Sequence, residues 1–127
     1  MNTKAGAVDN DELILLDLTS AERDFLFHGL IEWGGPGRMS DALAIAIGFD
    51  DAEDFRASKG VLADAILDGT GLSAQDWRRA LAAAEICFAS DTLGVGLEWE
   101  DVGVTSDEVT FEAMRSVQIK VTTHHIA

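Results

Sequence analysis

The sequence predicts an all-α protein: a single-domain bundle of about five helices, with a short extended segment near the N-terminus and a glycine-rich loop before the last helix. Three observations predict this fold. Helix-capping patterns, in which an acidic residue follows Ser or Thr three positions later, occur three times, and glycines end three of the apolar helical patterns. The chain has 127 residues, of which 47% are hydrophobic, so it can bury one core without disulfide staples.

The first 12 residues are small or polar, and we expect them to form a flexible N-terminal tail. The apolar run "ELILLDL" (12–18) follows, and it is too short for its periodicity to decide between helix and strand. It fits either a buried strand or an extended arm laid across the helices, and we favour the arm.

Two helices are predicted in the first half of the chain. Thr19 and Glu22 have the spacing of a capping box, and the following pattern is apolar on more than one face, which is typical of a central helix. That helix ends at "GGPG" (34–37), where glycine permits positive φ and proline cannot continue the hydrogen-bond ladder. Ser40 begins a second helix that ends before Gly48.

Three more helices are predicted after it. Asp50 or Asp51 caps a helix whose inner side chains include Phe55, Leu62 and Ile66, and Ser73 begins a helix with an apolar seam. The seam consists of Trp77, Leu81, Ala84 and Phe88. A loop over 91–104 precedes the last helix, which Thr105 is expected to cap and which should turn Val109, Met114 and Val117 inward. The predicted helical domain covers 13–120, and 121–127 is expected to be a loose C-terminal tail.

The charge is strongly negative. Twenty-three Asp and Glu face nine Lys and Arg, which gives a net charge of −14. Such a surface repels nucleic-acid backbones and anionic lipid and attracts basic proteins, although acidity can also serve solubility alone. The single cysteine excludes an internal disulfide framework, and no apolar stretch is long enough for a membrane span. We therefore expect a cytoplasmic protein, a monomer or a homodimer, that does not bind membranes.

The spacing of Ala44 and Gly48 before a new helix is that of many helix-turn-helix units, but the second helix begins with acids. Asp50, Asp51, Glu53 and Asp54 stand where basic or amide side chains would face phosphates. The segment is therefore either a solvated acidic corner or an anionic docking face. A nucleic-acid binder is a remote alternative, and it would need a basic face built from Arg38, Arg56, Arg78 and Arg79.

"LEWEDV" (97–102) is a second candidate for partner binding. Trp99 stands among Glu98, Glu100 and Asp101, and an aromatic side chain ringed by charge is a frequent hot-spot composition. The competing interpretation is that Trp99 folds back to close the core beneath the loop, as large aromatic residues usually do. From the sequence alone, Trp33, Trp77 and Trp99 can be either core or surface residues.

The alternative to a binding protein is a small enzyme or a metal-binding protein. Asp24, His28 and Glu32 are four residues apart and share one helix face, where a histidine between carboxylates could shuttle protons or bind a metal. Further ligands are not evident in the sequence. Cys87 lies in a small apolar pattern and is interpreted as a core residue. We predict no catalytic residues, no metal and no cofactor.

Four segments, "LTSAERDFLFHGLIEWGGPG", "DALAIAIGF", "LSAQDWRRALAAAEICFASD" and "GVGLEW", resemble small acidic helical proteins of high-GC Gram-positive bacteria. The resemblance spans about Leu18 to Gln118 and carries over no catalytic residue. In size and charge the chain is also similar to immunity proteins that neutralise toxins. The sequence thus favours a non-enzymatic, acidic interaction module, an immunity protein or antitoxin that binds a basic partner protein through the two acidic segments above.

Overall fold

The computed structural model describes residues 12–34, 38–100 and 105–126. It contains five α-helices, and two short 3-10 helices, Glu32–Gly34 (η1) and Gly96–Glu98 (η2). The α-helices are α2 (Ser20–Ile31), α3 (Asp41–Ala46), α4 (Ala52–Asp68), α5 (Ala74–Ala89) and α6 (Asp107–Ile126). The described residues include no β-strand beyond one isolated bridge, so the predicted all-α bundle is confirmed.

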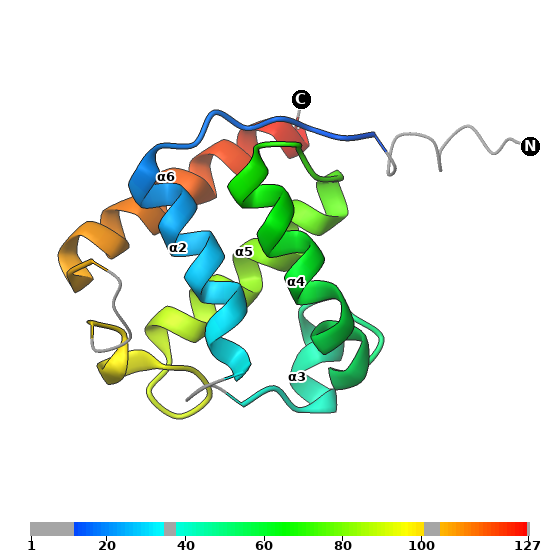
Figure 1. The fold of residues 1–127 in the computed structure, drawn as a ribbon, viewed down its shortest axis with the longest axis vertical. Coiled ribbons are helices and arrows are strands. Elements are labelled where there is room, and N and C mark those ends of the chain that lie inside the picture. The colour runs from blue at the N-terminus through cyan, green and yellow to red at the C-terminus, as the bar shows by residue number, and fades with distance from the viewer. Residues whose placement is uncertain (1–11, 35–37, 101–104, 127) are drawn as a thin grey trace, which may run out of the picture.

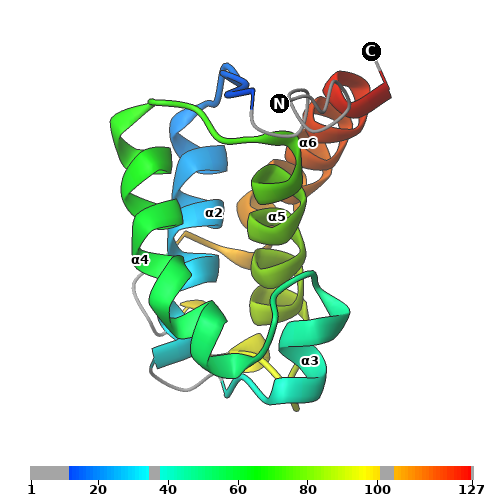
Figure 2. The ribbon, with the colours of Figure 1, turned by 90° about the vertical axis from the view of Figure 1, so that its right-hand side faces the viewer.

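The helices form two layers around α2. In Figure 1, α2 and α4 run side by side with α5 and α6 behind them, and Figure 2 shows the two pairs from the side, with α2 and α4 on the left and α5 and α6 on the right. The short helix α3 lies at one end, beside the start of α4. Because α2 contacts α4, α5 and α6, it is the central helix, as its apolar residues on more than one face predict.

The helices begin where side chains can accept the free N–H groups of the first turn. Thr19 caps α2 in a reciprocal box: the Glu22 N–H donates to Thr19 Oγ1 (3.2 Å) and the Thr19 N–H donates to Glu22 Oε1 (2.8 Å). Ser40, Asp51 and Ser73 cap α3, α4 and α5, each by accepting the N–H of the residue three positions later, without a reciprocal bond. All four of these predicted starts are therefore confirmed.

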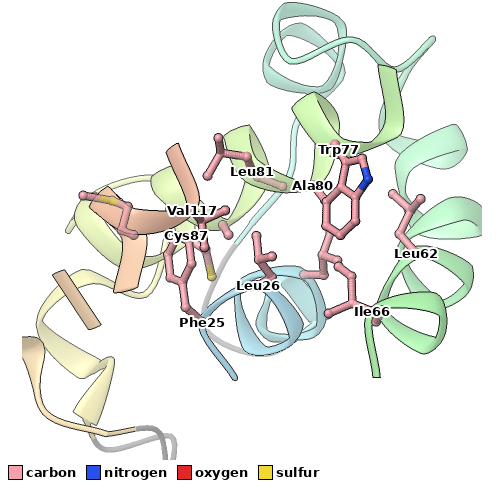
Figure 3. Packing of buried hydrophobic residues seen from close by; sticks show 14 of the residues in the cluster. Phe25, Leu26, Leu62, Ile66, Trp77, Ala80, Leu81, Cys87 and Val117 are labelled. Carbon is pink, nitrogen blue, oxygen red and sulfur yellow. The ribbon is translucent and has the colours of Figure 1, made fainter. Parts of the chain in front are cut away.

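The core is closed by an unusually tight crossing of α2 and α5. Figure 3 shows apolar side chains of α2, α4, α5 and α6 converging, with Leu26 of α2 near the middle. At the crossing, a Cβ placed on Gly29 would lie 2.3 Å from the Cβ of Ala84 and 2.5 Å from its Cα. Glycine at 29 therefore lets the two helices approach more closely than any other residue would.

All three tryptophans are buried, and each indole N–H donates to a different part of the molecule. Trp33 donates to the Ala83 carbonyl of α5 (3.2 Å), and Trp77 donates to the Ile14 carbonyl (2.8 Å). Trp99 donates to Thr110 Oγ1 of α6 (3.1 Å). The tryptophans are therefore core residues whose polar edges are satisfied, as buried indoles usually are.

Residues 12–19 form an extended arm that is hydrogen-bonded to the rest of the protein at Ile14 and at Asp17. Ile14 and Leu72 exchange two backbone hydrogen bonds (2.7 and 3.2 Å), which form the isolated antiparallel bridge. Lys120 Nζ of α6 donates to the Asp17 carbonyl (2.6 Å) on the same arm. The arm thus joins the α4–α5 turn to α6, in agreement with the predicted extended segment.

The same lysine forms a partly buried ion pair that ties α6 to the start of α2. Glu22 is only 3% exposed, and its Oε1 accepts from Lys120 Nζ at 2.6 Å. Burial raises the pKa of the Glu22 carboxyl, but hydrogen bonds from Lys120, Ser116 and Thr19, with the Lys120 charge, outweigh it and hold the pKa below its ordinary 4.5. The carboxylate is therefore kept ionised inside the bundle.

The last helix differs from the prediction in three respects. Its cap is Ser106 rather than Thr105, since Ser106 Oγ accepts the Val109 N–H at 3.3 Å. Val109 is 40% exposed, and Thr110 is buried in its place because it binds the Trp99 indole. The helix continues to Ile126, past the predicted domain boundary at residue 120, and Val121 is buried against the core. None of the described helices combines the length and apolarity that crossing a bilayer requires.

Candidate interaction surfaces

The acidic corner between α3 and α4 is partly structural. Asp51 Oδ1 accepts the Asp54 N–H (2.7 Å) as the N-cap of α4, and Asp54 Oδ2 accepts the Asp50 N–H (2.9 Å). Asp41 Oδ1 accepts the Ala52 N–H (2.9 Å) from across the turn. These three carboxylates offset the free N–H groups and the positive end of the α4 dipole, so they stabilise the corner itself.

The side chains of Asp50 and Glu53 have no such structural role in the corner. Both are exposed, and no hydrogen bond or ion pair of either side chain is found among the described residues. Of the four acids predicted to form a docking face here, these two are therefore the ones directed wholly to solvent.

The corner is fixed to α5 by Arg79, and not in a manner that suits nucleic acid. Arg79 Nε donates to the Gly48 carbonyl (2.7 Å), its Nη1 pairs with Asp76 (3.1 Å), and its guanidinium lies 5.1 Å from the centre of the Phe49 ring. Gly48 has φ of 108°, as the tight helical corner requires. An arginine held in this way positions the turn, and is taken away from the basic face that a nucleic-acid binder would need.

The second acidic segment is only partly available. Glu98 and Glu100 are exposed, but Trp99 is fully buried between the loop and α6, so it is not a surface hot spot. The indole N–H needs a partner inside the protein, and Thr110 supplies one. Asp101 lies outside the described residues. Of this segment, the two glutamates remain as candidates for contact.

Glu100 lies next to a surface groove that the sequence did not predict. Its Oε2 accepts the Asp107 N–H at the start of α6 (2.7 Å), which places the loop beside a groove of about 380 Å³. The groove is lined by Phe88, Asp107, Glu108, Phe111 and Glu112. A signal was present in the sequence, because Glu108, Phe111 and Glu112 recur at three and four residues and so share one helix face.

The two acidic segments do not form one continuous face. Figure 1 places the start of α4 and the η2 turn on opposite sides of the lower end of α2. We therefore treat the corner (Asp50, Glu53) and the loop with the start of α6 (Glu98, Glu100 and the groove) as two separate anionic surfaces.

Little catalytic or metal-binding chemistry is available on the α2 face that carries Asp24, His28 and Glu32. His28 Nδ1 lies 3.5 Å from Glu32 Oε2, and its ring packs edge-on against Phe27 (centroids 5.3 Å apart). Asp24 is exposed on the same helix. Within 12–34, 38–100 and 105–126, no group of three His, Cys, Asp or Glu side chains is placed to hold a metal ion. Burial raises the pKa of the Cys87 thiol to about 12, so it is not a nucleophile near neutral pH.

Comparisons with protein-family models, with curated proteins and with solved structures give no match to this chain.

Proposed function

We propose that this chain is a non-enzymatic interaction module of the bacterial cytoplasm that binds a basic protein partner, as an immunity protein or antitoxin does. The observation that carries the proposal concerns three of the predicted contact residues, Asp50, Glu53 and Glu98: all are exposed, and none has a side-chain partner among the described residues, on a chain of net charge −14. Unpaired exposed charge of one sign speeds encounter with an oppositely charged surface.

The opposing interpretation is that these acids serve solubility alone. The arrangement of the acids at the α3–α4 corner argues against solubility as their sole role. Asp51 and Asp54 already satisfy the needs of the helix start, and Asp50 and Glu53 add further negative charge beside them. Placing like charges close together costs stability, which a protein selected only for solubility avoids by spreading them.

The test uses a tagged chain to capture partners from lysates of the cells that produce it, at low and at high salt. Captured proteins are identified by mass spectrometry, and the association rate of each purified partner is measured by stopped flow over a range of ionic strength. We expect a basic protein whose association rate falls steeply as salt rises.

The charge-reversal variant Asp50→Lys with Glu53→Lys should slow that association and flatten its salt dependence. It leaves Asp51 and Asp54 in place, because reversing these would also remove hydrogen bonds at the helix start. The matched control, Asp64→Lys with Asp68→Lys, changes the charge equally at exposed sites further along α4. Equal rates for the two variants would remove the corner from the interface, and failure to capture any basic protein would contradict the proposed function.

A further inference from the structure

We propose that the groove between the end of α5 and the start of α6 docks an arginine side chain presented by the partner. This inference rests on the proposed function and names the chemistry that one of its two anionic surfaces recognises. The groove holds about 380 Å³, which suits one or two side chains rather than a whole helix.

The exposed ring of Phe111 is the first observation. Phe111 is 53% exposed on the first half of α6, although Ala113, Met114 and Val117 of the same helix are buried. A large aromatic side chain held at the surface of a groove gives a flat apolar face on which a guanidinium can stack.

The second observation is that the floor of the groove is packed against the core. Phe88 lines it from α5, and its ring packs edge-on against Trp99 (centroids 5.2 Å apart) and against Phe25 (6.3 Å). The Trp99 indole is in turn held by Thr110 of α6. A preorganised floor lowers the entropy cost of docking a side chain.

The charge of the lining selects the occupant. Three of the five lining residues are acidic and none is basic. Asp107 and Glu108 belong to the first turn of α6, where acids favour the helix dipole, but Glu112 lies beyond it and that account does not cover it. Arg115, further along α6, donates to Gln118 Oε1 (2.6 Å). The lining thus combines an aromatic face with carboxylates, which a planar, permanently charged guanidinium satisfies better than a lysine ammonium does.

A second copy of the chain is a poor occupant, because an anionic groove repels another chain of charge −14. A wholly apolar segment would desolvate the three carboxylates without pairing them, at a cost in free energy. An arginine on a basic protein avoids both penalties.

The experiment is a titration followed by amide NMR at low salt. The probes are two capped peptides with the sequence Gly-X-Gly-X-Gly, in which X is arginine in one and lysine in the other. We expect the arginine peptide to shift the amide signals of residues 107–112 and of Phe88, and to bind more tightly than the lysine peptide. Phe111→Ala should weaken the arginine peptide about two- to fivefold, the usual range for an exposed cation–π contact.

Matched variants separate the groove from general charge attraction. Val61→Ala removes another exposed apolar side chain, from α4, and Asp64→Asn removes one charge there, as Glu112→Gln does in the groove. If the two α6 variants weaken the arginine peptide no more than the two α4 variants do, or if lysine and arginine bind equally, the inference is refuted.

The partner protein distinguishes this inference from the proposed function. Should a captured basic partner bind Phe111→Ala and Glu112→Gln normally but respond to reversal of Asp50 and Glu53, the groove is wrong and the proposed function stands. Should the arginine peptide dock at the groove while no basic protein is captured, the groove chemistry is supported and the proposed function fails.

Discussion

Replacing Gly29 by alanine should destabilise the bundle, although alanine is the better helix former. The substitution adds one methyl group at the crossing of α2 and α5. That carbon would lie 2.3 Å from the Cβ of Ala84 and 2.5 Å from its Cα, whereas carbon atoms in contact are normally about 3.5–4.0 Å apart. Because one of the clashing atoms belongs to the backbone, no rotamer change can relieve the clash, and α2 and α5 must separate by more than about 1 Å.

The expected magnitude combines two opposing terms. Inserting a methyl group into a packed core costs about 1–3 kcal/mol, and alanine regains about 0.5–1 kcal/mol over glycine inside a helix. The free energy of unfolding should therefore fall by about 1 kcal/mol at the middle of these ranges, and by about 2.5 kcal/mol at most. In a chain of this size the melting temperature should fall by about 4–8 °C.

Gly60 provides a matched control within the same molecule. It lies inside α4, is exposed, and a Cβ there would meet nothing within 4 Å. Gly60→Ala should therefore raise the free energy of unfolding by about 0.5–1 kcal/mol. Urea unfolding followed by circular dichroism measures both variants, and the reasoning fails if Gly29→Ala is as stable as Gly60→Ala.

Three further predictions concern single side chains. Glu22→Gln should lower the free energy of unfolding by about 2 kcal/mol at pH 7, because it removes the charged hydrogen bond to Lys120. Since the pKa of Glu22 is depressed in the folded protein, the stability that its carboxylate contributes is present above pH 4.5 and is lost as the pH falls below that value. The difference in stability between wild type and variant should therefore shrink on acid titration. Cys87, with a pKa of about 12, should resist Ellman's reagent at pH 8 in the folded protein and react rapidly in urea, and fast reaction of the folded protein would disprove its burial. Asp51→Ala should cost about 1 kcal/mol through the lost N-cap, whereas thermal melts of the neighbouring Asp50→Ala should show little change.

The helices could be predicted because their ends depend on local chemistry. A capping side chain bonds to an N–H only a few residues away, so Thr19, Ser40 and Ser73 could be read directly as helix starts. The close α2–α5 crossing could not be predicted, because the need for glycine at 29 arises from Ala84, more than fifty residues later in the chain. The end of α6 was missed for a similar reason, since the burial of Val121 depends on helices that are distant in sequence.

The candidate site shows the same limit. The acidity of the corner was evident, but which acids are free depends on backbone partners such as the Ala52 N–H, which Asp41 binds from another helix. The sequence allowed Trp99 to be either a surface contact residue among charged neighbours or a core residue; it is a core residue, and the hydrogen-bond partner that its buried indole needs is Thr110 on α6. Phe111 was overlooked, although its spacing from Glu108 and Glu112 places the three side chains on one face of that helix.

The three hydrogen-bonded tryptophans give this molecule a built-in optical readout. The sequence contains no tyrosine, so with excitation at wavelengths longer than phenylalanine absorbs, the fluorescence comes from these indoles alone. Each indole is anchored to a different part of the chain: Trp33 to α5, Trp77 to the arm and Trp99 to α6. Variants that keep one tryptophan and carry phenylalanine at the other two positions would therefore report three events separately. Trp77 would report detachment of the arm, Trp33 the separation of η1 from α5, and Trp99 the loosening of the η2 loop from α6.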